Sequence, residues 1–473
     1  MTKTIALLLA LAAAAPAAAQ APDSMPLSLE AAVGRALEVG DEVLLARAQV
    51  DLTSAQVITA RASGLPQLRL TSTYNHVFEN ARANAVGQIF NQPNTYNTNA
   101  NLSQTIFQGG RVFAGWRAAR RLNSAARLTA QEVRSQTAYD VQQAYLQALF
   151  TQQLMDIQNA NLQLAEGQLR QVSQFESSGR AARFDVLRAR VERANIEPQL
   201  IQARSDYDMA LVELKRLTNV PAETPIKLTT RLTPENVEAT VVGLLQDEGG
   251  IEQRASVQAA EFNARARKDA IRVARADLFP TITVFVQSGY QAFPTANVFP
   301  WESGRLAPEF CPTGSTAARC QNGGWFPDRS MGVQMNWPLF DGLRTKGNID
   351  AAQAQAKIAD LQLRQEREDV AAEIEEARAA FRRAQALFAA RRENATEANE
   401  AFRLVTLRYN RGLSTQLDVS DTQIALMTAR TNEARAVYDL YLAGAELARA
   451  QGKPIPLPVT SPNEPRRTVG EQN

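Results

Sequence analysis

Four short segments of the chain alternate apolar and polar residues, a pattern that predicts β-strands with one apolar face. The expected strands span about residues 66–77, 96–108, 280–292 and 329–340. In the clearest of them, one face carries Met331, Val333, Met335, Trp337 and Leu339. The other face carries only small or polar residues, Ser330, Gly332, Gln334 and Asn336. Such strands usually form half of a sandwich, but the sequence offers no further strands for the opposing layer.

Two much longer segments, 111–177 and 343–410, are rich in Ala, Gln, Leu and Arg and predict helices. At about 1.5 Å per residue, a helix of about 65 residues is roughly 100 Å long. No compact domain contains such a helix, so we expect both to pack on similar helices as coiled coils. A glycine turn ends each one, and we place these tips at residues 178–185 and 411–418. A second helix follows each tip, which makes two helical hairpins.

Shorter patterns complete the chain. The stretch Leu27–Ser63 reads as one helix, with Ser28 as N-cap and an apolar stripe. That stripe contains Leu29, Val33, Leu37 and Leu44. Residues 221–250 predict loops around one short helix, with Thr233 as its N-cap and Pro234 at its first position.

The same order of elements occurs twice. Phe107 and Phe340, Gly179 and Gly412, and Asp185 and Asp418 are each separated by 233 positions, so the long helix and tip have kept their length. Fixed-period similarity indicates a duplicated unit. We therefore expect a first repeat at 21–220, an equatorial insert at 221–250 and a second repeat at 251–452. Upstream of the strands the offset is 214, which places 19 extra residues in the loop of the second repeat.

The termini and cysteines add expectations about the compartment. Residues 1–20 have the charged, apolar and small-residue regions of a signal peptide, and no cysteine follows to carry a lipid anchor. Residues 453–473 form a flexible, Pro-rich tail. Cys311 and Cys320, in the long loop, predict a disulfide in an oxidising compartment. A metal pair is less favoured, because His76 is the only histidine.

Charge and motifs exclude several classes of function. Removing Lys3 lowers the formal net charge from +2 to +1, which gives no electrostatic reason for nucleic-acid binding. The sequence contains no phosphate-binding glycine loop after a strand and no HExxH motif. It therefore predicts no enzyme and no cofactor, and after the signal peptide it has no apolar run long enough for a transmembrane helix.

Exported strands of about ten residues with one apolar face fit a transmembrane β-barrel. The smallest such barrel has eight strands, and open edges are not tolerated in lipid, so several chains must each contribute four. Two chains give eight strands and three give twelve. Long helices that must also wrap a passage favour three.

Together these features resemble the outer membrane factor (TolC) family of efflux and secretion ducts. The resemblance rests on the strand entries at Pro66 and Pro280, on the exits Ile106-Phe107 and Leu339-Phe340, and on the two Gly-x5-Asp-Val tips. It implies a mainly α chain whose helices form a periplasmic tunnel. It also implies a homotrimer with a twelve-stranded barrel in outer-membrane lipid of a Gram-negative-type cell. The implied partners are a periplasmic adaptor and an inner-membrane RND or ABC pump.

In this family the tips close the channel and dock the adaptor. The resemblance transfers that role to Gly179, Arg180, Asp185, Val186, Leu187, Gly412, Leu413, Ser414, Thr415, Leu417 and Val419. It also implies a constriction formed by Asp418 and Asp421, whose six carboxylates in a trimer would select cations. Asp185 and Asp418 equally fit a capping role at a helix start. Asp421 differs from its counterpart in the first repeat, Arg188.

One position departs from the family pattern. Some members have an arginine two residues after the second glycine, in a latch between hairpins, whereas this chain has Ser414. The candidates for a substitute latch are Arg180, Arg183, Arg188, Tyr409 and Arg411. We expect an exit duct for small-molecule efflux. The alternatives are a duct for type I protein secretion, a heavy-metal duct, which seven methionines and one histidine make less favoured, and a non-membrane coiled-coil structural protein.

Overall fold

The computed structural model describes residues 24–79, 81, 85, 93–241, 244, 250–293 and 325–457. The chain forms two compact units, one made of residues 45–132 and 251–371 and the other of the remaining segments. The expected signal peptide, Cys311 with Cys320, and residues 458–473 of the expected tail lie outside the described residues. Within the described part, no helix is both long and apolar enough to cross a membrane.

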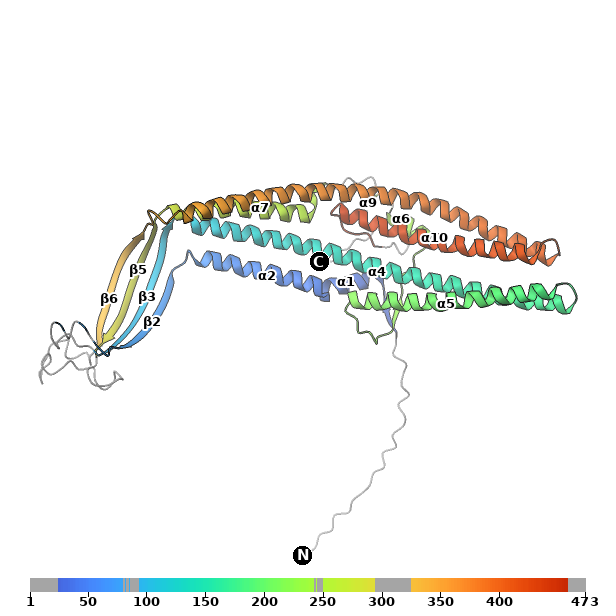
Figure 1. Ribbon diagram of the computed structural model, residues 1–473, viewed down its shortest axis with the longest axis horizontal. Helices are drawn as coiled ribbons and strands as arrows, with labels where there is room; N and C mark the ends of the chain where they lie inside the picture. Colours follow the sequence, from blue (N-terminus) through green and yellow to red (C-terminus); the bar gives the residue numbers. More distant parts are fainter. Residues whose placement is uncertain are drawn as a thin grey trace, which may run out of the picture. The chain divides into compact units, whose positions relative to one another are not determined.

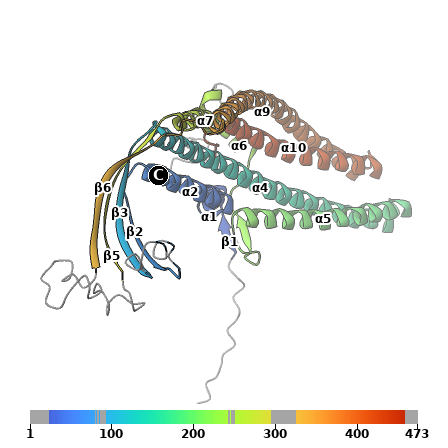
Figure 2. The ribbon, with the colours of Figure 1, turned by 60° about the vertical axis from the view of Figure 1, so that its left-hand side comes forward.

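The unit made of residues 45–132 and 251–371 contains a four-stranded antiparallel sheet (Figures 1 and 2). Its strands are β2 (Gln67–His76), β3 (Asn94–Gln108), β5 (Thr281–Ala292) and β6 (Trp325–Asn336), in the order β2-β3-β5-β6. The central pair, β3 and β5, joins the two halves of the duplication. Among the described residues, β2 and β6 have no partner on their outer edges.

The register of this sheet brings the apolar positions of all four strands onto one face. Leu68 pairs with Leu102, Leu102 with Val286, and Val286 with Met331. Leu68 is 74% exposed and Met331 is 81% exposed, so no described element covers this face. The opposite face carries polar rows such as Arg69, Asn101, Gln287 and Ser330. The expected alternation is therefore confirmed, and it produces an uncovered apolar surface.

The helices repeat with the same lengths in both halves of the chain. The long helices α4 (Arg111–Ser177) and α9 (Arg344–Asn410) have 67 residues each. They lead into α5 (Arg183–Leu217) and α10 (Gln416–Ala450), of 35 residues each. Each boundary of α9 and α10 lies 233 positions after its equivalent in α4 and α5. The two hairpins (Figure 1) are therefore built to the same length, as expected from the constant offset.

The prediction of a single helix over Leu27–Ser63 is wrong. The structure has a short strand β1 (Met25–Leu27), then α1 (Leu29–Val39), then α2 (Asp41–Ala62). Gly40 separates the helices because its backbone is extended, with ψ at 132°. Ser28 does cap α1, since its Oγ accepts a hydrogen bond from the Ala31 N–H at 3.1 Å. Leu44, beyond the break, is 44% exposed, so it does not continue the buried stripe of α1.

The equatorial part of the other unit contains a second, smaller sheet that the sequence patterns did not reveal. Here β1 pairs in parallel with β4 (Ile226–Leu228), inside the segment expected to be mainly loops. The buried Tyr145 hydroxyl of α4 fixes this pair by donating to the Leu27 carbonyl at 2.8 Å. The expected short helix is present as α6 (Pro234–Val241), and Thr233 caps it.

Candidate functional site

Both hairpin tips turn through the same backbone motif. Gly179 has a φ of +75° and Gly412 a φ of +74°, the left-handed conformation that glycine adopts without steric cost. In the first tip, the Arg180 N–H donates to the Phe175 carbonyl at 2.7 Å. In the second, the Leu413 N–H donates to the Arg408 carbonyl at 2.9 Å. These bonds, with one from each glycine N–H, form a Schellman motif that satisfies the last carbonyls of α4 and α9.

At the equivalent positions of the two tips, the apolar and the basic side chain occur in opposite order. In the first tip, the Arg180 guanidinium lies over the Phe175 ring, 4.3 Å from its centroid. In the second tip, the arginine comes first, as Arg408, and the apolar residue follows, as Leu413. Arg408 Nη2 donates to the Leu413 carbonyl at 3.4 Å. The tips therefore have one shape but different surface chemistry.

The predicted aspartates at 185 and 418 bond to the backbone at the starts of α5 and α10. Asp418 Oδ2 accepts from the Thr415 N–H at 2.8 Å, and Thr415 Oγ1 accepts from the Asp418 N–H at 3.2 Å. These hydrogen bonds, led by the one from the Thr415 backbone, hold the pKa of Asp418 below its usual value. Asp185 makes only one such bond, from the Ala182 N–H at 3.1 Å. Alanine has no side-chain acceptor, and the Asp185 N–H donates instead to the Ala182 carbonyl at 3.0 Å, so only the second tip has the reciprocal side-chain cap.

The other predicted tip residues divide by burial. Val186 and Val419 are buried in the hairpins, whereas Leu187, Leu413 and Leu417 are between 43% and 65% exposed. Asp421 lies exposed on α10, one turn beyond Asp418. The exposed leucines are therefore available to a partner, and Asp421 is available to solvent or to another chain.

Among the described residues, no side-chain hydrogen bond or ion pair joins the candidate latch residues to one another, although the charge of Arg180 acts on the Tyr409 hydroxyl. Arg188 bonds to Glu192 on its own helix at 3.3 Å. Tyr409 packs near Phe175 of the other hairpin, with 6.1 Å between ring centroids. Burial, and after it the negative charge of Asp185, raises the pKa of the Tyr409 hydroxyl. Arg183 and Arg411 are exposed, and Ser414 is half-buried.

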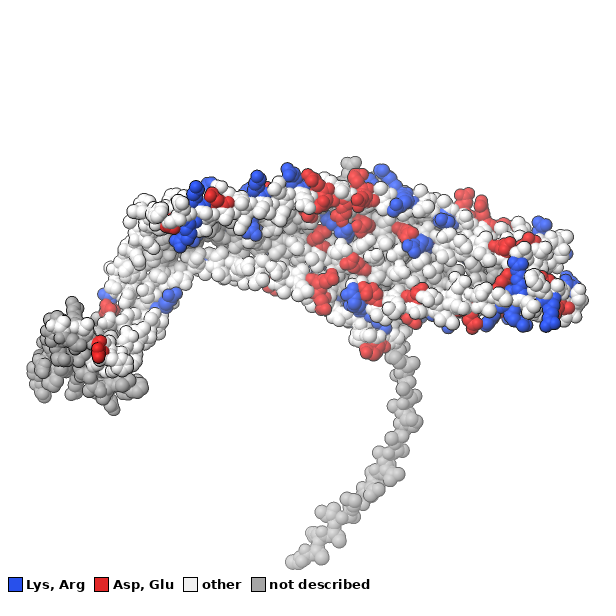
Figure 3. Space-filling view, in the orientation of Figure 1, with Lys and Arg blue, Asp and Glu red and all other residues white. Residues whose placement is uncertain are grey.

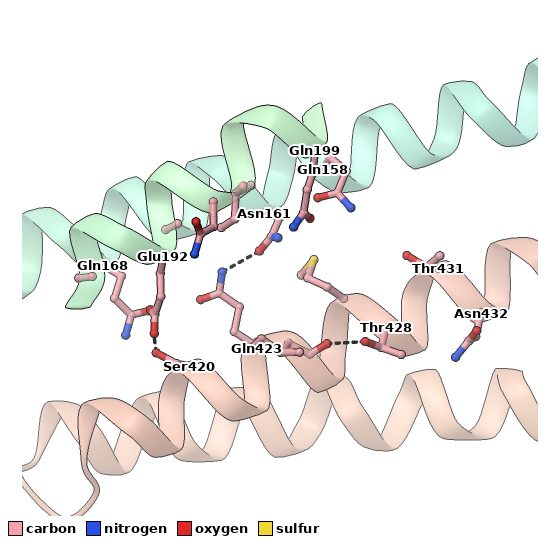
Figure 4. A pocket seen from close by; sticks show the side chains of 16 residues that line it. Gln158, Asn161, Gln168, Glu192, Gln199, Ser420, Gln423, Thr428, Thr431 and Asn432 are labelled. Carbon is pink, nitrogen blue, oxygen red and sulfur yellow. Dashed lines mark hydrogen bonds between the residues drawn. The ribbon is translucent and has the colours of Figure 1, made fainter. Parts of the chain in front are cut away.

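The hairpins are instead joined by a seam of polar hydrogen bonds that sequence reasoning did not identify; Figure 4 shows the bonds of Gln423 with Asn161 and of Ser420 with Glu192. Gln423 Nε2 donates to Asn161 Oδ1 at 2.7 Å, in a buried setting. Ser420 Oγ donates to Glu192 Oε2 at 2.8 Å, and Gln168 Nε2 donates to Gln416 Oε1 at 3.1 Å. We call these three pairs the polar seam. All of them connect α10 with α4 or α5.

A cavity of about 510 Å³ lies along this seam. Most of its other lining side chains are amides and hydroxyls, and apolar side chains such as Ile424 and Met427 complete the wall (Figure 4). Polar walls of this kind can be satisfied by water held in the cavity. The described residues contain no group of three or more His, Cys, Asp or Glu arranged to hold a metal ion.

The sequence holds only a partial signal for the seam. The position equivalent to Asn161 in the second repeat is Asn394, so both long helices carry an asparagine at the same place. Asparagine is a poor helix former, which makes its presence in both helices a sign of a local role. The partner position does not repeat, however, because Gln423 corresponds to Arg190. Asn394 and Arg190 are both exposed, so the repeated asparagine forms the buried bond in one copy only.

Comparison with known proteins relates the chain to a protein family. The chain matches the family model for outer membrane efflux proteins over residues 32–220 and 250–453. Nodulation protein T of Rhizobium leguminosarum bv. viciae is 23% identical over 411 residues, which cover 86% of this chain and 78% of the relative. The toluene efflux pump outer membrane protein TtgF of Pseudomonas putida is 26% identical over 337 residues, covering 71% and 64% respectively. The crystal structure of the outer membrane protein VceC from Vibrio cholerae matches with a TM-score of 0.68 at 21% identity, over 90% of this chain and 96% of that one.

Proposed function

The chain belongs to the outer membrane efflux protein family, and from this membership we propose that three copies form the exit duct of a tripartite efflux system. Proteins of this family are outer-membrane channels with a periplasmic helical part rather than enzymes. In the proposed assembly, an inner-membrane pump supplies the energy and a periplasmic adaptor connects it to the duct. Substrates then pass through the duct passively.

The observation that carries the trimer is the four-stranded sheet with two open edges and an exposed apolar face. Lipid does not tolerate unpaired strand edges, because no water is present to satisfy their N–H and C=O groups. Pairing β6 of one copy with β2 of the next satisfies these edges. Three copies give twelve strands, which leave room for a channel, and the polar face of the sheet lines it.

In the same assembly, each copy contributes two hairpins to the tunnel. The equal lengths of α4 and α9, and of α5 and α10, let all six tips end at one level. Such a level arrangement can close as a single gate and can present one docking surface to an adaptor. The exposed Leu187, Leu413 and Leu417 supply apolar contacts for that surface.

The gate includes an aspartate ring at the second tip. Asp418 is already engaged by Thr415, whereas Asp421 is exposed, so Asp421 is the main charge offered to passing ions. Rings of carboxylates favour cations. Asp421→Asn should reduce the cation preference of single channels in planar bilayers and weaken their block by divalent cations. Unchanged selectivity and block would exclude this ring.

The polar seam keeps the two hairpins of each copy together in the closed gate. Its hydrogen bonds can be exchanged for bonds to water at little net cost, which suits a contact that must open and close. For the latch between neighbouring hairpins, the proposed residues are Arg180, Arg183, Arg188, Tyr409 and Arg411.

For the substrate, we favour small molecules over secreted proteins. The support is the similarity to TtgF, an outer membrane protein of a toluene efflux pump. Cells that lack this chain should accumulate organic solutes and dyes and become sensitive to them. Normal efflux combined with loss of a secreted protein from the medium would instead identify a secretion duct.

The assembly itself is tested with the purified chain. A particle with the mass of three chains that forms conducting channels in planar bilayers is expected. A monomeric, water-soluble chain recovered from the periplasmic extract would identify a non-membrane coiled-coil protein and end the proposal.

A further inference from the structure

We propose that the junction between the sheet and the helices binds the phosphate groups of anionic phospholipids. This inference rests on the proposed function, because it places the junction at the periplasmic surface of the outer membrane. The residues concerned are Arg61, Arg275, Arg344 and Lys346, which we call the basic collar. All four side chains are exposed and lie in one compact unit.

At two positions of the junction, both repeats of the chain carry an arginine. Arg61 in the last turn of α2 corresponds to Arg275 in the last turn of α7 (Ala255–Arg275), at the offset of 214. Arg111, the first residue of α4, corresponds to Arg344, the first residue of α9, at the offset of 233. In a trimer, these four arginines place twelve guanidinium groups around the junction.

The local charge balance differs from that of the whole chain. Residues 61–66, 106–111, 275–281 and 339–346 contain five basic and two acidic residues, whereas the chain as a whole carries 51 and 49. Both acids are engaged. Asp277 pairs with Arg111, and Asp341 accepts hydrogen bonds from the Thr345 N–H and hydroxyl. Asp277 is therefore paired with a residue outside the collar, whereas Asp341 keeps its charge and forms a long ion pair with Arg344 at 3.9 Å. Five basic and two acidic residues still leave a net positive charge at the junction.

Helix electrostatics do not explain the basic residues at the start of α9. The N-terminus of a helix carries a partial positive charge, so a cation there is disfavoured. Arg344 Nε lies 3.9 Å from Asp341 Oδ2 in a long ion pair, and the Arg344 side chain is 75% exposed. Asp341 compensates part of this repulsion, and an anion from outside the chain would offset the charge that remains on Arg344 and Lys346.

The surface beside the collar fits a lipid. Leu339, Phe340 and Leu343 are 83%, 82% and 65% exposed. They follow β6 in the chain, and β6 carries part of the apolar face of the sheet. The Trp337 indole N–H donates to the Leu278 carbonyl at 3.2 Å, which holds this strand exit against the neighbouring segment. Charged side chains are sparse over the sheet and gather on the helices (Figure 3). Arginine and lysine next to exposed apolar side chains are typical of residues that place their stems in the acyl region and their charges among headgroups.

The test measures lipid retention by the full-length trimer. The protein in mild detergent is mixed with phosphatidylglycerol or with phosphatidylcholine, and bound lipid is counted by native mass spectrometry. The wild type should retain phosphatidylglycerol preferentially. Each collar charge removed should reduce that preference about fivefold, and R61Q/R275Q/R344Q/K346Q should abolish it. The smaller change R344Q/K346Q gives the same readout if the fourfold variant does not assemble.

The matched control removes four exposed arginines away from the junction, in R190Q/R382Q/R383Q/R391Q. It should retain the wild-type preference. Two results would overturn the proposal: equal retention of both lipids by the wild type, or an undiminished preference in R344Q/K346Q. A changed ion selectivity of R344Q/K346Q with unchanged lipid retention would assign the collar to the channel lumen and also overturn it. Failure of the duct proposal is a separate outcome, seen as the absence of trimers and of conductance in the wild type.

Discussion

At the scale of single residues, the two tips differ most in how their second helices begin. Thr415 gives α10 a side-chain acceptor and an N–H donor, whereas Ala182 gives α5 its N–H donor and, as acceptor, only its backbone carbonyl. Replacing a threonine cap by alanine costs about 1 kcal/mol. Thr415→Ala should therefore speed amide exchange in the first turn of α10 roughly fivefold.

The reciprocal change serves as the control. Ala182→Thr should slow exchange in the first turn of α5 by a similar factor, because it completes the same motif around Asp185. Hydrogen–deuterium exchange with mass spectrometry resolves both segments. Equal exchange in the wild type and both variants would show that packing, and not capping, holds these helix starts.

The capping of α10 also carries a pH dependence. The pKa of Asp418 is lowered from its usual 3.8 in the folded chain by the bonds from Thr415. A carboxyl with a depressed folded pKa contributes stability above the unfolded pKa and loses it as the pH falls through the folded value. Protection of the first turn of α10 should thus be constant at neutral pH and fall below about pH 3.8. Asp418→Asn should remove this dependence, and Asp421→Asn should leave it in place.

The roles of residues near the tips could be predicted from the sequence only where the local backbone conformation requires a particular residue type. The glycine turns at 179 and 412 could be predicted, because few other residues adopt the left-handed conformation that the structure shows there. Asn161 and Gln423 were missed because an amide on a long helix is usually solvated, as Asn394 is in the second repeat. Asn161 and Gln423 are 262 positions apart in the sequence, so their pairing depends on how the two hairpins pack against each other.

At the scale of elements, the polar seam decides how firmly the hairpins are held. Gln423→Leu leaves the buried Asn161 amide without its partner, which should cost about 1–3 kcal/mol. Replacing both residues by leucine removes the orphaned group and should recover most of the loss. Thermal unfolding of the two single variants and the double variant gives the coupling energy. Additive losses would mean that the bond does not couple the hairpins.

The elements themselves were largely predictable, because the four helix boundaries of one hairpin recur in the other at a constant offset of 233 positions. The exceptions have a common cause. Gly40 interrupts an otherwise helical stretch, and β1 and β4 are three residues long, too short to show an alternation. Each is defined by contacts within the equatorial region rather than by its own sequence pattern.

At the scale of the whole molecule, the two faces of the sheet have opposite tolerances for charge. Val333 lies on the apolar face of β6, and Ser330 lies on its polar face. In the proposed trimer, Val333 faces lipid, where an arginine near the membrane midplane costs about 2–4 kcal/mol per copy. Ser330 faces the channel, where an arginine remains hydrated.

Val333→Arg should therefore lower the amount of trimer in the outer-membrane fraction, whereas Ser330→Arg should assemble normally and shift ion selectivity toward anions. Both positions are exposed in the single chain and share a strand, so local folding cannot separate the two variants. Membrane fractionation and bilayer conductance measure the two effects. If both arginines are tolerated equally, the apolar face does not meet lipid. The sheet must then be covered by protein, and the barrel would have to be abandoned.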